Sequence, residues 1–303
     1  MKHMKREGYK EKFSRAAAAQ STSYELSEEE MAALKQCLLV MALDLIGLCE
    51  RNGIRVALAG GSALGAVRHQ GFIPWDDDLD LIMPREDYSH FCKVLSAELG
   101  EKYYIAGPNS GEFYKTRFPK VFKRNTVFKA ISDVGSELPC GVFLDIFLLE
   151  NVPGNSILRK LKGAWCSVLM FAGARVYMYE HDNPVMRRHM SATEQSLRDY
   201  EKAVRWGKIL SVIPSNKWFD WVDRAVQYHK ETGYLGIPTG RRHYFGEILP
   251  YTAYLPFSKG MFEGHEVPLP ADCDMYLKNL YGDYMQIPPP EKREKHYIVE
   301  LKL

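Results

Sequence analysis

Apolar and polar positions along the chain predict a half in which strands and helices alternate. Ser27 and Glu30 form a capping box before apolar residues at helical spacing, which predicts a helix that ends near Arg51. Short apolar runs after it predict strands separated by turns and by two more helices. The predicted strands are 54–59, 79–83, 102–106, 116–123, 126–130 and 141–148, and the two helices are 63–69 and 84–99. The chain up to about Glu150 is therefore predicted to be a mixed α/β unit.

The pattern then changes to long helical runs from about 155 to 230, with Pro184 and Pro214 as breaks. Strands near 244–248 and 260–267 and a helix at 271–281 are predicted to follow. These changes divide the chain into four predicted segments. They are a disordered or loosely attached N-terminus (1–24), an α/β core (25–150), a mainly helical region (151–240) and C-terminal strands and a helix that pack back on the core (241–303).

Composition narrows the class of protein without naming a partner. Among 303 residues, 46% are hydrophobic, which is enough for a globular core. The 40 Lys and Arg residues nearly balance 38 Asp and Glu residues, so charge demands no nucleic-acid partner and none is expected. The six cysteines show neither a CxxC pair nor zinc spacing, and the N-terminus lacks the apolar core of a signal peptide. These features favour a cytoplasmic protein with reduced thiols.

One apolar run, 163–179, is long enough to raise the question of a membrane. It is shorter than the roughly 20 apolar residues that cross a bilayer, and it contains Arg175. A buried core helix is therefore favoured. Because basic residues precede the run, the alternative is peripheral contact with the inner face of a membrane through 159–179. The basic residues are Arg159, Lys160 and Lys162.

Four aspartates stand within five positions in the stretch GFIPWDDDLDLIMPRE, residues 71–86. On a strand, Asp78 and Asp80 project from the same face, so their charges repel unless a cation or a proton compensates. Carboxylate oxygens suit Mg²⁺, which also binds substrate phosphates. A solvated acidic turn that caps the next helix is the alternative.

Two further features make a metal and phosphate site the better interpretation. Gly60, Gly61 and Ser62 form a predicted strand-to-helix turn, where backbone N–H groups can bind an anion. Asp145 lies alone in an apolar strand, and burying an unpaired carboxylate costs several kcal/mol. We therefore expect Asp145 to meet a metal or a buried cation, with a salt bridge on an edge strand as the alternative.

The text AGGSALGAVRHQGFIPWDDDLDLIMPREDY, followed by LYGDYMQIPPPEKREKH at 280–296, resembles the LicD/fukutin-related family. The resemblance covers about 50–150 and 245–296. It implies an α+β fold in which a mixed β-sheet nucleotidyltransferase core, like that of DNA polymerase β, carries a large helical insertion or subdomain. It also implies metal-dependent transfer of phosphocholine, or a related alcohol phosphate, from a CDP-activated donor, with CDP-choline favoured. The acceptor would be a hydroxyl of a cell-surface glycan such as teichoic acid or lipopolysaccharide, or its lipid-linked precursor, and CMP would be released.

The resemblance assigns roles to individual residues. Asp78, Asp80 and Asp145 would hold Mg²⁺, or Mn²⁺, and Asp145 is also the candidate for accepting the acceptor's proton. Asp77 is expected to be solvated. The expected substrate-binding residues are Gly60, Gly61, Ser62, Arg68, Asp76, Arg117 and Lys120. Arg117, Lys120 and Lys123 would line one strand and add cationic contacts, although ordinary surface charge is the alternative for each basic residue.

Aromatic side chains could surround a choline head group, but the pattern does not single out a box. The candidates are Trp75, Tyr244, Phe245, Tyr254 and Tyr281. The segment 280–284 is expected either to pack on the sheet or to contact substrate, with His296 near the site. Two other functions remain open: a nucleotidyltransferase that moves NMP onto a small molecule, protein or RNA, and a binding module of the same fold without activity.

Overall fold

The first helix of the fold is α2, Glu28–Arg51, and it confirms the predicted capping box. The computed structural model describes residues 25–109, 114, 116–130, 133–134, 140–290, 293 and 298–303, so the N-terminal segment 1–24 and His296 lie outside the described residues. Ser27 Oγ accepts from the Glu30 N–H, and Glu30 Oε2 accepts from the Ser27 N–H. The apolar face of α2 is buried in the main hydrophobic core.

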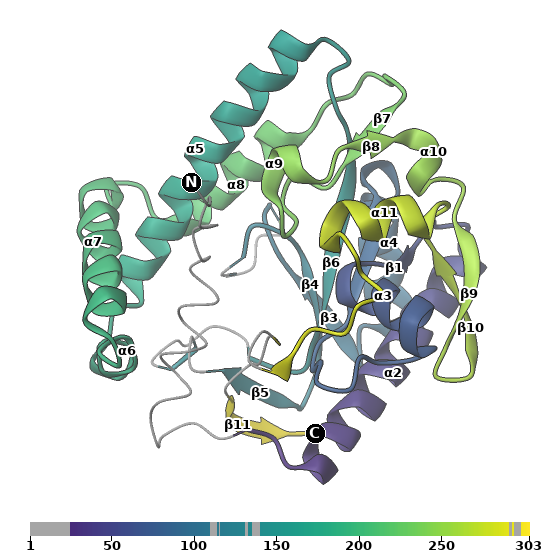
Figure 1. Cartoon of the computed structure of the whole chain (residues 1–303), viewed down its shortest axis with the longest axis horizontal. Helices are drawn as coiled ribbons and strands as arrows, with labels where there is room; N and C mark the ends of the chain where they lie inside the picture. The colour runs from purple at the N-terminus through teal and green to yellow at the C-terminus, as the bar shows by residue number, and fades with distance from the viewer. Residues whose placement is uncertain are drawn as a thin grey trace.

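The main sheet of the described residues is mixed, with β1-β2-β6-β4-β3 as its strand order (Figure 1). β2 and β6 are parallel, whereas β1 pairs with β2, and β4 with both β6 and β3, in antiparallel fashion. β7 pairs in antiparallel fashion with the end of β6 and also with β8. The bounds are β1 (Ala57–Leu58), β2 (Asp80–Pro84), β3 (Tyr103–Ala106), β4 (Lys120–Lys123), β6 (Phe143–Asn151), β7 (Tyr234–Gly236) and β8 (Leu249–Pro250). This arrangement confirms a mixed α+β fold.

Helices and two small sheets surround the main sheet. α3 follows β1, α4 follows β2, and α11 packs against α3 (Figure 1). Their bounds are Gly60–His69 for α3, Arg85–Leu99 for α4 and Cys273–Tyr281 for α11. The small sheets are the hairpin of β9 (Ser258–Phe262) and β10 (His265–Leu269), and the pair of β5 (Val127–Ala130) and β11 (Ile298–Lys302). The parallel pair β2 and β6 sets Asp80 beside Asp145 in register, and this pair positions the candidate site.

The predicted helical region is confirmed as four helices that lie to one side of the sheet (Figure 1). α5 packs against both α7 and α8. Pro184 and Pro214 fall at the starts of α6 and α8, as their missing N–H groups favour. The bounds are Ser156–Glu180 for α5, Pro184–Met190 for α6, Glu194–Leu210 for α7 and Ser215–Val226 for α8.

Several predicted elements were wrong in type or length. The run predicted as a strand at 244–248 is mostly the short helix α9, His243–Gly246, in which Tyr244 is buried against α5. The strand predicted at 116–123 starts only at Lys120. The segment 163–179 is a core helix on one face only, because its opposite face is exposed. The short elements β7, β8, α10 (Tyr251–Tyr254) and β11 were not predicted.

One helix among the described residues, α2, has the length and hydropathy of a membrane span. Ten of its side chains are buried in the structure, and they belong to the main core. Packing against the sheet therefore accounts for its apolar composition.

Candidate active site

The turn at the start of α3 lies against the carboxylates of Asp76 and Asp80. Gly60 has a φ of +49°, and a Cβ built on it would lie 2.5 Å from Asp80 Oδ2. A Cβ on Gly61 would lie 2.8 Å from Asp76 Oδ2. Only glycine permits both the left-handed backbone and this close approach, and the positive end of the α3 dipole favours the two negative charges.

The backbone of this turn is tied to neighbouring elements. The Gly60 N–H donates to the hydroxyl of the fully buried Tyr276 on α11, at 2.9 Å. The Asp80 N–H donates to Ser62 Oγ at 2.9 Å, and the Ala59 N–H donates to the Asp80 carbonyl. These bonds fix the start of α3 against β2 and α11. The phosphate contacts predicted for Gly60, Gly61 and Ser62 remain predictions.

The four aspartates differ in their surroundings. Buried Leu79 and Leu81 alternate with half-buried Asp78 and Asp80, which confirms the predicted alternation even though β2 begins only at Asp80. Asp77 was expected to be solvated, and this was wrong: it is 7% exposed. Asp77 therefore lies in the protein interior, before β2 begins.

Tyr281 of α11 lies close to the other three aspartates of the acidic stretch. Burial raises the pKa of the Tyr281 hydroxyl, and Arg241, whose guanidinium carbon is 5.8 Å from the ring centroid, lowers it. Three carboxylates then raise it again, in the order Asp80, Asp76, Asp78. Tyr281 therefore lies within electrostatic range of the acidic cluster at the start of α3, and Arg241 lies beside Tyr281.

Asp145 meets a buried cation, as the cost of an unpaired charge predicts. Lys120 stands opposite it in the antiparallel pair of β4 and β6, and its ammonium group forms an ion pair with Asp145 Oδ1. Both residues are buried. The ammonium nitrogen also lies 3.4 Å from the centroid of the Phe143 ring. β6 lies between β2 and β4, so the alternative of an edge-strand salt bridge was wrong.

Arg68 links α3 to the C-terminal segment of the site. Its Nη1 donates to the Tyr284 carbonyl at 2.7 Å and lies 3.5 Å from the Gln286 carbonyl oxygen, and its Nε donates to His69 Nε2. Burial lowers the pKa of Arg68, whereas Tyr281 and Asp76 raise it. In this structure the guanidinium therefore holds the 280–286 segment beside the acidic cluster.

Arg117 holds a second segment near the site. It donates to the carbonyls of Thr239 and Gly240 at 3.0 and 3.1 Å, directly before Arg241. Of the three basic residues expected to line one strand, Lys120 and Lys123 lie on β4 as predicted, whereas Arg117 precedes it. Lys123 reaches Cys37 of α2, because residues three apart on a strand do not share a face.

The buried Glu247 is bonded to the backbone of this second segment. It is 3% exposed, and its Oε1 accepts from the Arg242 N–H at 2.9 Å. Burial raises the pKa of Glu247 to about 7, and the Arg242 N–H lowers it. The bond closes the loop that carries Arg241.

The donor types at the site suit a hard divalent cation, but they do not yet form a metal centre. Asp80 and Asp145 are neighbours across the parallel strands, and Asp78 and Asp76 lie close by. Within the described ranges, however, no three His, Cys, Asp or Glu side chains converge enough to hold a metal ion. Asp145 is instead paired with Lys120. Two carboxylates could therefore bind a metal ion in this arrangement. Asp145 could be a third ligand if Lys120 moved away.

The aromatic candidates separate by burial. Tyr244 and Tyr254 are buried core residues, and Phe245 packs against Gly163 of α5. Trp75 lies under the guanidinium of Arg293, at 4.1 Å from its ring centroid. Tyr281 is the candidate that the structure places at the acidic cluster.

Two residues of the site were not singled out from the sequence. Arg241 follows a glycine in a segment without recognisable periodicity, and Tyr276 looks like any aromatic residue on the core face of a helix. Their roles depend on the packing of 239–247 and α11 against α3. No local signal could have found them.

Comparison with known proteins finds similarity to one family. A family model described as LicD/FKTN/FKRP, nucleotidyltransferase domain, matches residues 53–137, which contain the turn and the aspartates. The chain is therefore similar to the LicD/fukutin-related family. It is 29% identical over 267 residues to the lipopolysaccharide cholinephosphotransferase LicD of Haemophilus influenzae, a match that covers 84% of this chain and 90% of that protein.

Shorter matches reach more distant proteins. An uncharacterized protein of Rickettsia typhi is 42% identical over 77 residues, which is 25% of this chain and 24% of that protein. The human ribitol 5-phosphate transferase FKRP is 45% identical over 56 residues, 18% of this chain and 11% of FKRP. The chain thus spans only a small part of FKRP, whereas it matches nearly the whole length of LicD.

Proposed function

We propose that this protein transfers phosphocholine, or a related alcohol phosphate, from a CDP-activated donor to a hydroxyl of a cell-surface glycan or its lipid-linked precursor. The protein is a LicD-like phosphotransferase, and its relatives are named for transfer of cholinephosphate and of ribitol 5-phosphate. CDP-choline is the favoured donor, because the LicD match covers most of the chain. The proposal also assigns the sheet around β2 and β6 to the nucleotidyltransferase type of core.

The observation that carries the proposal is the acidic cluster at the start of α3, with Tyr281 and Arg241 beside it. Close carboxylates at a helix N-terminus are costly unless a cation joins them, and phosphoryl transfer depends on positioning and neutralising charge. Arg241, whose guanidinium carbon is 5.8 Å from the Tyr281 ring centroid, would contact a phosphate oxygen by a charge-assisted hydrogen bond.

The reaction has a simple balance of bonds. The acceptor oxygen forms a bond to the phosphorus that carries the alcohol, and the bond from that phosphorus to the bridging oxygen breaks. CMP leaves with the bridging oxygen, and the hydroxyl proton goes to a base. Asp145 is the proposed base, and Lys120 holds its carboxylate in place until substrate binds.

In the proposed site Asp78 and Asp80 would hold Mg²⁺, or Mn²⁺, and Asp145 would be a third ligand if Lys120 moved aside. The ion would neutralise the phosphate oxygens during transfer. Asp76 would bind water molecules of the ion, and Arg68 would keep the segment 280–286 against the site. The Gly60 and Gly61 turn would leave room for phosphate next to the carboxylates.

The direct test is incubation with a panel of CDP-activated alcohols and Mg²⁺, with a lipopolysaccharide and a teichoic acid fragment as acceptors. We expect CMP release and a phosphocholine-modified product that mass spectrometry identifies. Release of pyrophosphate with a nucleotidylated acceptor would instead establish the alternative nucleotidyltransferase. Removal of the metal with EDTA is expected to stop the reaction, and added Mg²⁺ or Mn²⁺ to restore it.

Substitution separates the metal ligands from other acids. We expect Asp80→Ala to lower turnover by about 10³-fold or more, because it removes a ligand that neutralises the phosphates. Asp199→Asn on α7 is the control, since Asp199 lies on the helical region and contacts Gln195. Full turnover in the Asp80→Ala variant would contradict the metal assignment.

A further inference from the structure

The long helix α5 has an apolar face that the rest of the described protein leaves exposed. The large apolar side chains of this face are 46 to 69% exposed. They recur at helical spacing over more than three turns, and they are Ile157, Leu161, Trp165, Val168 and Phe171. The opposite face, which includes Cys166, Met170 and Gly173, is buried against neighbouring elements. α5 is therefore apolar on both sides, and the helical bundle uses only one of them.

The charge of α5 has one sign along this face. Between 156 and 179 the sequence contains no acidic residue, and its charged residues are Arg159, Lys160, Lys162 and Arg175. Lys162 is engaged with backbone carbonyls at the end of α8, and Arg159 with Pro153. Lys160 is exposed beside the apolar face, and Arg175 continues it, with its guanidinium carbon 4.7 Å from the Phe171 ring centroid. Basic side chains therefore border the apolar face at both ends.

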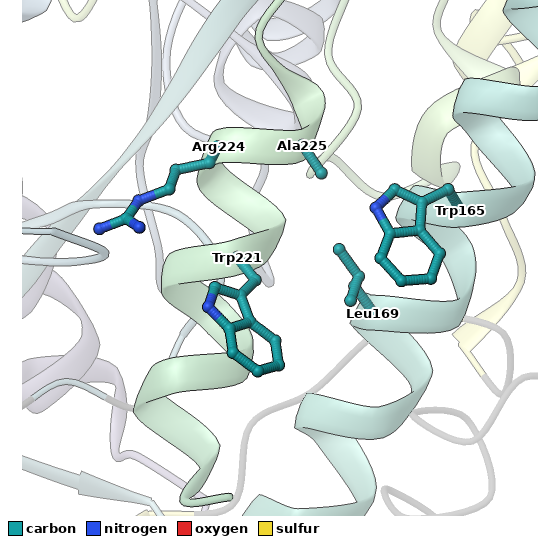
Figure 2. Close-up of a pocket in the computed structure, with 5 residues that line it drawn as sticks. All are labelled: Trp165, Leu169, Trp221, Arg224 and Ala225. Atoms are coloured by element: carbon teal, nitrogen blue, oxygen red, sulfur yellow. The ribbon is translucent and has the colours of Figure 1, made fainter.

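α8 widens this apolar surface. Trp165 and Leu169 of α5 face Trp221 and Ala225 of α8 across an open pocket of about 260 Å³, which Arg224 also lines although its guanidinium points away from α5 (Figure 2). Trp221 is partly exposed, and Arg224 is exposed at the border of the pocket. The surface thus has two tryptophans near its centre and another basic residue at its edge.

We propose that this α5 face binds the interface of an anionic lipid bilayer. Amphipathic helices that lie in the membrane plane insert apolar and aromatic side chains to the depth of the headgroups while basic residues contact anionic lipids. The first turns of α5 project beyond the body of the protein, so a flat surface can reach them (Figure 1). A second copy of the chain fits less well, because a symmetric contact would bring the same basic residues together.

The membrane inference goes beyond the proposed function and does not depend on it. It concerns a surface on the helical region, whereas the candidate active site lies between β2, β6 and α3. Vesicle binding can therefore be present in a protein that releases no CMP, and CMP release can be measured without vesicles. The two proposals fail independently.

The test is flotation of the full chain with vesicles of phosphatidylcholine alone and with vesicles that also contain phosphatidylglycerol. We expect binding to the anionic vesicles that is about tenfold or more tighter than binding to the neutral ones. The Leu161→Ser/Val168→Ser double variant should bind the anionic vesicles about tenfold or more weakly, because two apolar contacts are lost. Lys160→Glu should reduce the preference for anionic lipid.

The matched control is Ile209→Ser on α7, because Ile209 and Leu161 are both 65% exposed. We expect it to bind vesicles as the wild type does. A second readout is tryptophan fluorescence: the emission should shift to shorter wavelength on vesicles, and Trp165→Phe should reduce the shift while binding persists.

Each other outcome contradicts the proposal. Absence of wild-type binding to anionic vesicles would overturn it, and so would equal binding by the Leu161→Ser/Val168→Ser variant. An equal loss in Ile209→Ser would show that the contact is not specific to α5. Self-association without lipid that the double variant abolishes would assign the face to a second copy instead.

Discussion

Gly60 and Asp80 form the closest contact at the start of α3. Replacing Gly60 with alanine would force a Cβ to within 2.5 Å of Asp80 Oδ2, at a backbone φ of +49°. We expect Gly60→Ala to lose roughly 1 kcal/mol of stability from backbone strain. We also expect CMP release to fall about 10²-fold, because the Asp80 carboxylate must move from its position beside the turn. Steady-state kinetics and thermal unfolding measure the two effects.

Gly53 provides a matched control for the backbone strain. Its φ is +66°, and nothing lies within 4 Å of a Cβ built on it. Gly53→Ala should therefore lose similar stability and keep its turnover. If both variants lost turnover equally, the contact with Asp80 would not explain the result.

Glu247 is expected to make the stability of the folded protein depend on pH. Burial raises the pKa of Glu247 from its ordinary value of 4.5 to about 7. The folded state therefore binds a proton more tightly than the unfolded state, and its stability should fall as pH rises from about 4.5 through 7. Glu247→Gln should reduce this fall by roughly 1–3 kcal/mol. Urea unfolding at several pH values measures it, with the exposed Glu101→Gln as a control.

The acidic stretch shows which properties of single residues the sequence predicts and which it does not. The alternation of Leu79 and Leu81 with Asp78 and Asp80 follows from strand geometry alone. The burial of Asp77 and the pairing of Asp145 with Lys120 do not, because they depend on which loop and which strand come to lie beside them. The burial cost predicted that Asp145 would have a cationic partner but could not say whether that partner was a metal or a lysine.

Among the elements, the long helices were predicted most closely. The 24-residue α2 and the 15-residue α4 carry several turns of periodicity and were confirmed nearly to the residue. Short elements were predicted only where an apolar run marked them, as for β2, β3 and β5, whereas β7, β8, α10 and β11 were missed. The exposed face of α5 was also hidden, since sequence periodicity cannot tell an apolar face that is buried from one that is not.

The C-terminal segment 280–286 depends on α3 for its position. Arg68 donates to the Tyr284 carbonyl and lies near the Gln286 carbonyl, so Arg68→Gln removes the guanidinium that joins the two elements. We expect faster proteolysis within 282–290 and a rise in KM of about tenfold, since each lost charge-assisted bond costs about 1.5–3 kcal/mol before relaxation. Arg198→Gln on α7 is the control. Unchanged cleavage in Arg68→Gln would show that other contacts hold the segment.

For the whole molecule, the main question is what joins the helical region to the sheet. The main core is built from α2, the sheet and the elements around α11, whereas the helical region contributes smaller apolar clusters. Between them lies a buried ionic contact: Arg85 at the start of α4 donates to Glu150 at 2.6 Å and to Asp223 of α8 at 2.8 Å. Asn109 donates to the other oxygen of Asp223. These bonds connect β6, α4 and α8.

Removing Arg85 should destabilise the protein strongly, even though only a few side chains form this junction. Arg85→Leu leaves Glu150 and Asp223 buried without a cation, and we expect a loss of about 3–5 kcal/mol in the free energy of unfolding. Burial already raises the pKa of Glu150 to about 7 and Arg85 lowers it, so the variant's Glu150 should hold its proton more tightly. Stability should then fall more steeply as pH rises, and the loss should be larger at pH 8 than at pH 5.

Chemical denaturation, with hydrogen exchange of α5 to α8, measures the effect of Arg85→Leu. The triple variant Arg85→Leu/Glu150→Gln/Asp223→Asn removes all three charges and should recover most of the lost stability, because the cost arises from unpaired charge and not from lost packing. Arg198→Leu breaks an exposed pair with Glu194 and should change stability by less than about 1 kcal/mol. If the triple variant were as unstable as Arg85→Leu, the loss would come from packing of the arginine side chain, and the apolar cluster of Phe219 with Ala106 and Phe122 would remain as the contact that joins α8 to the sheet.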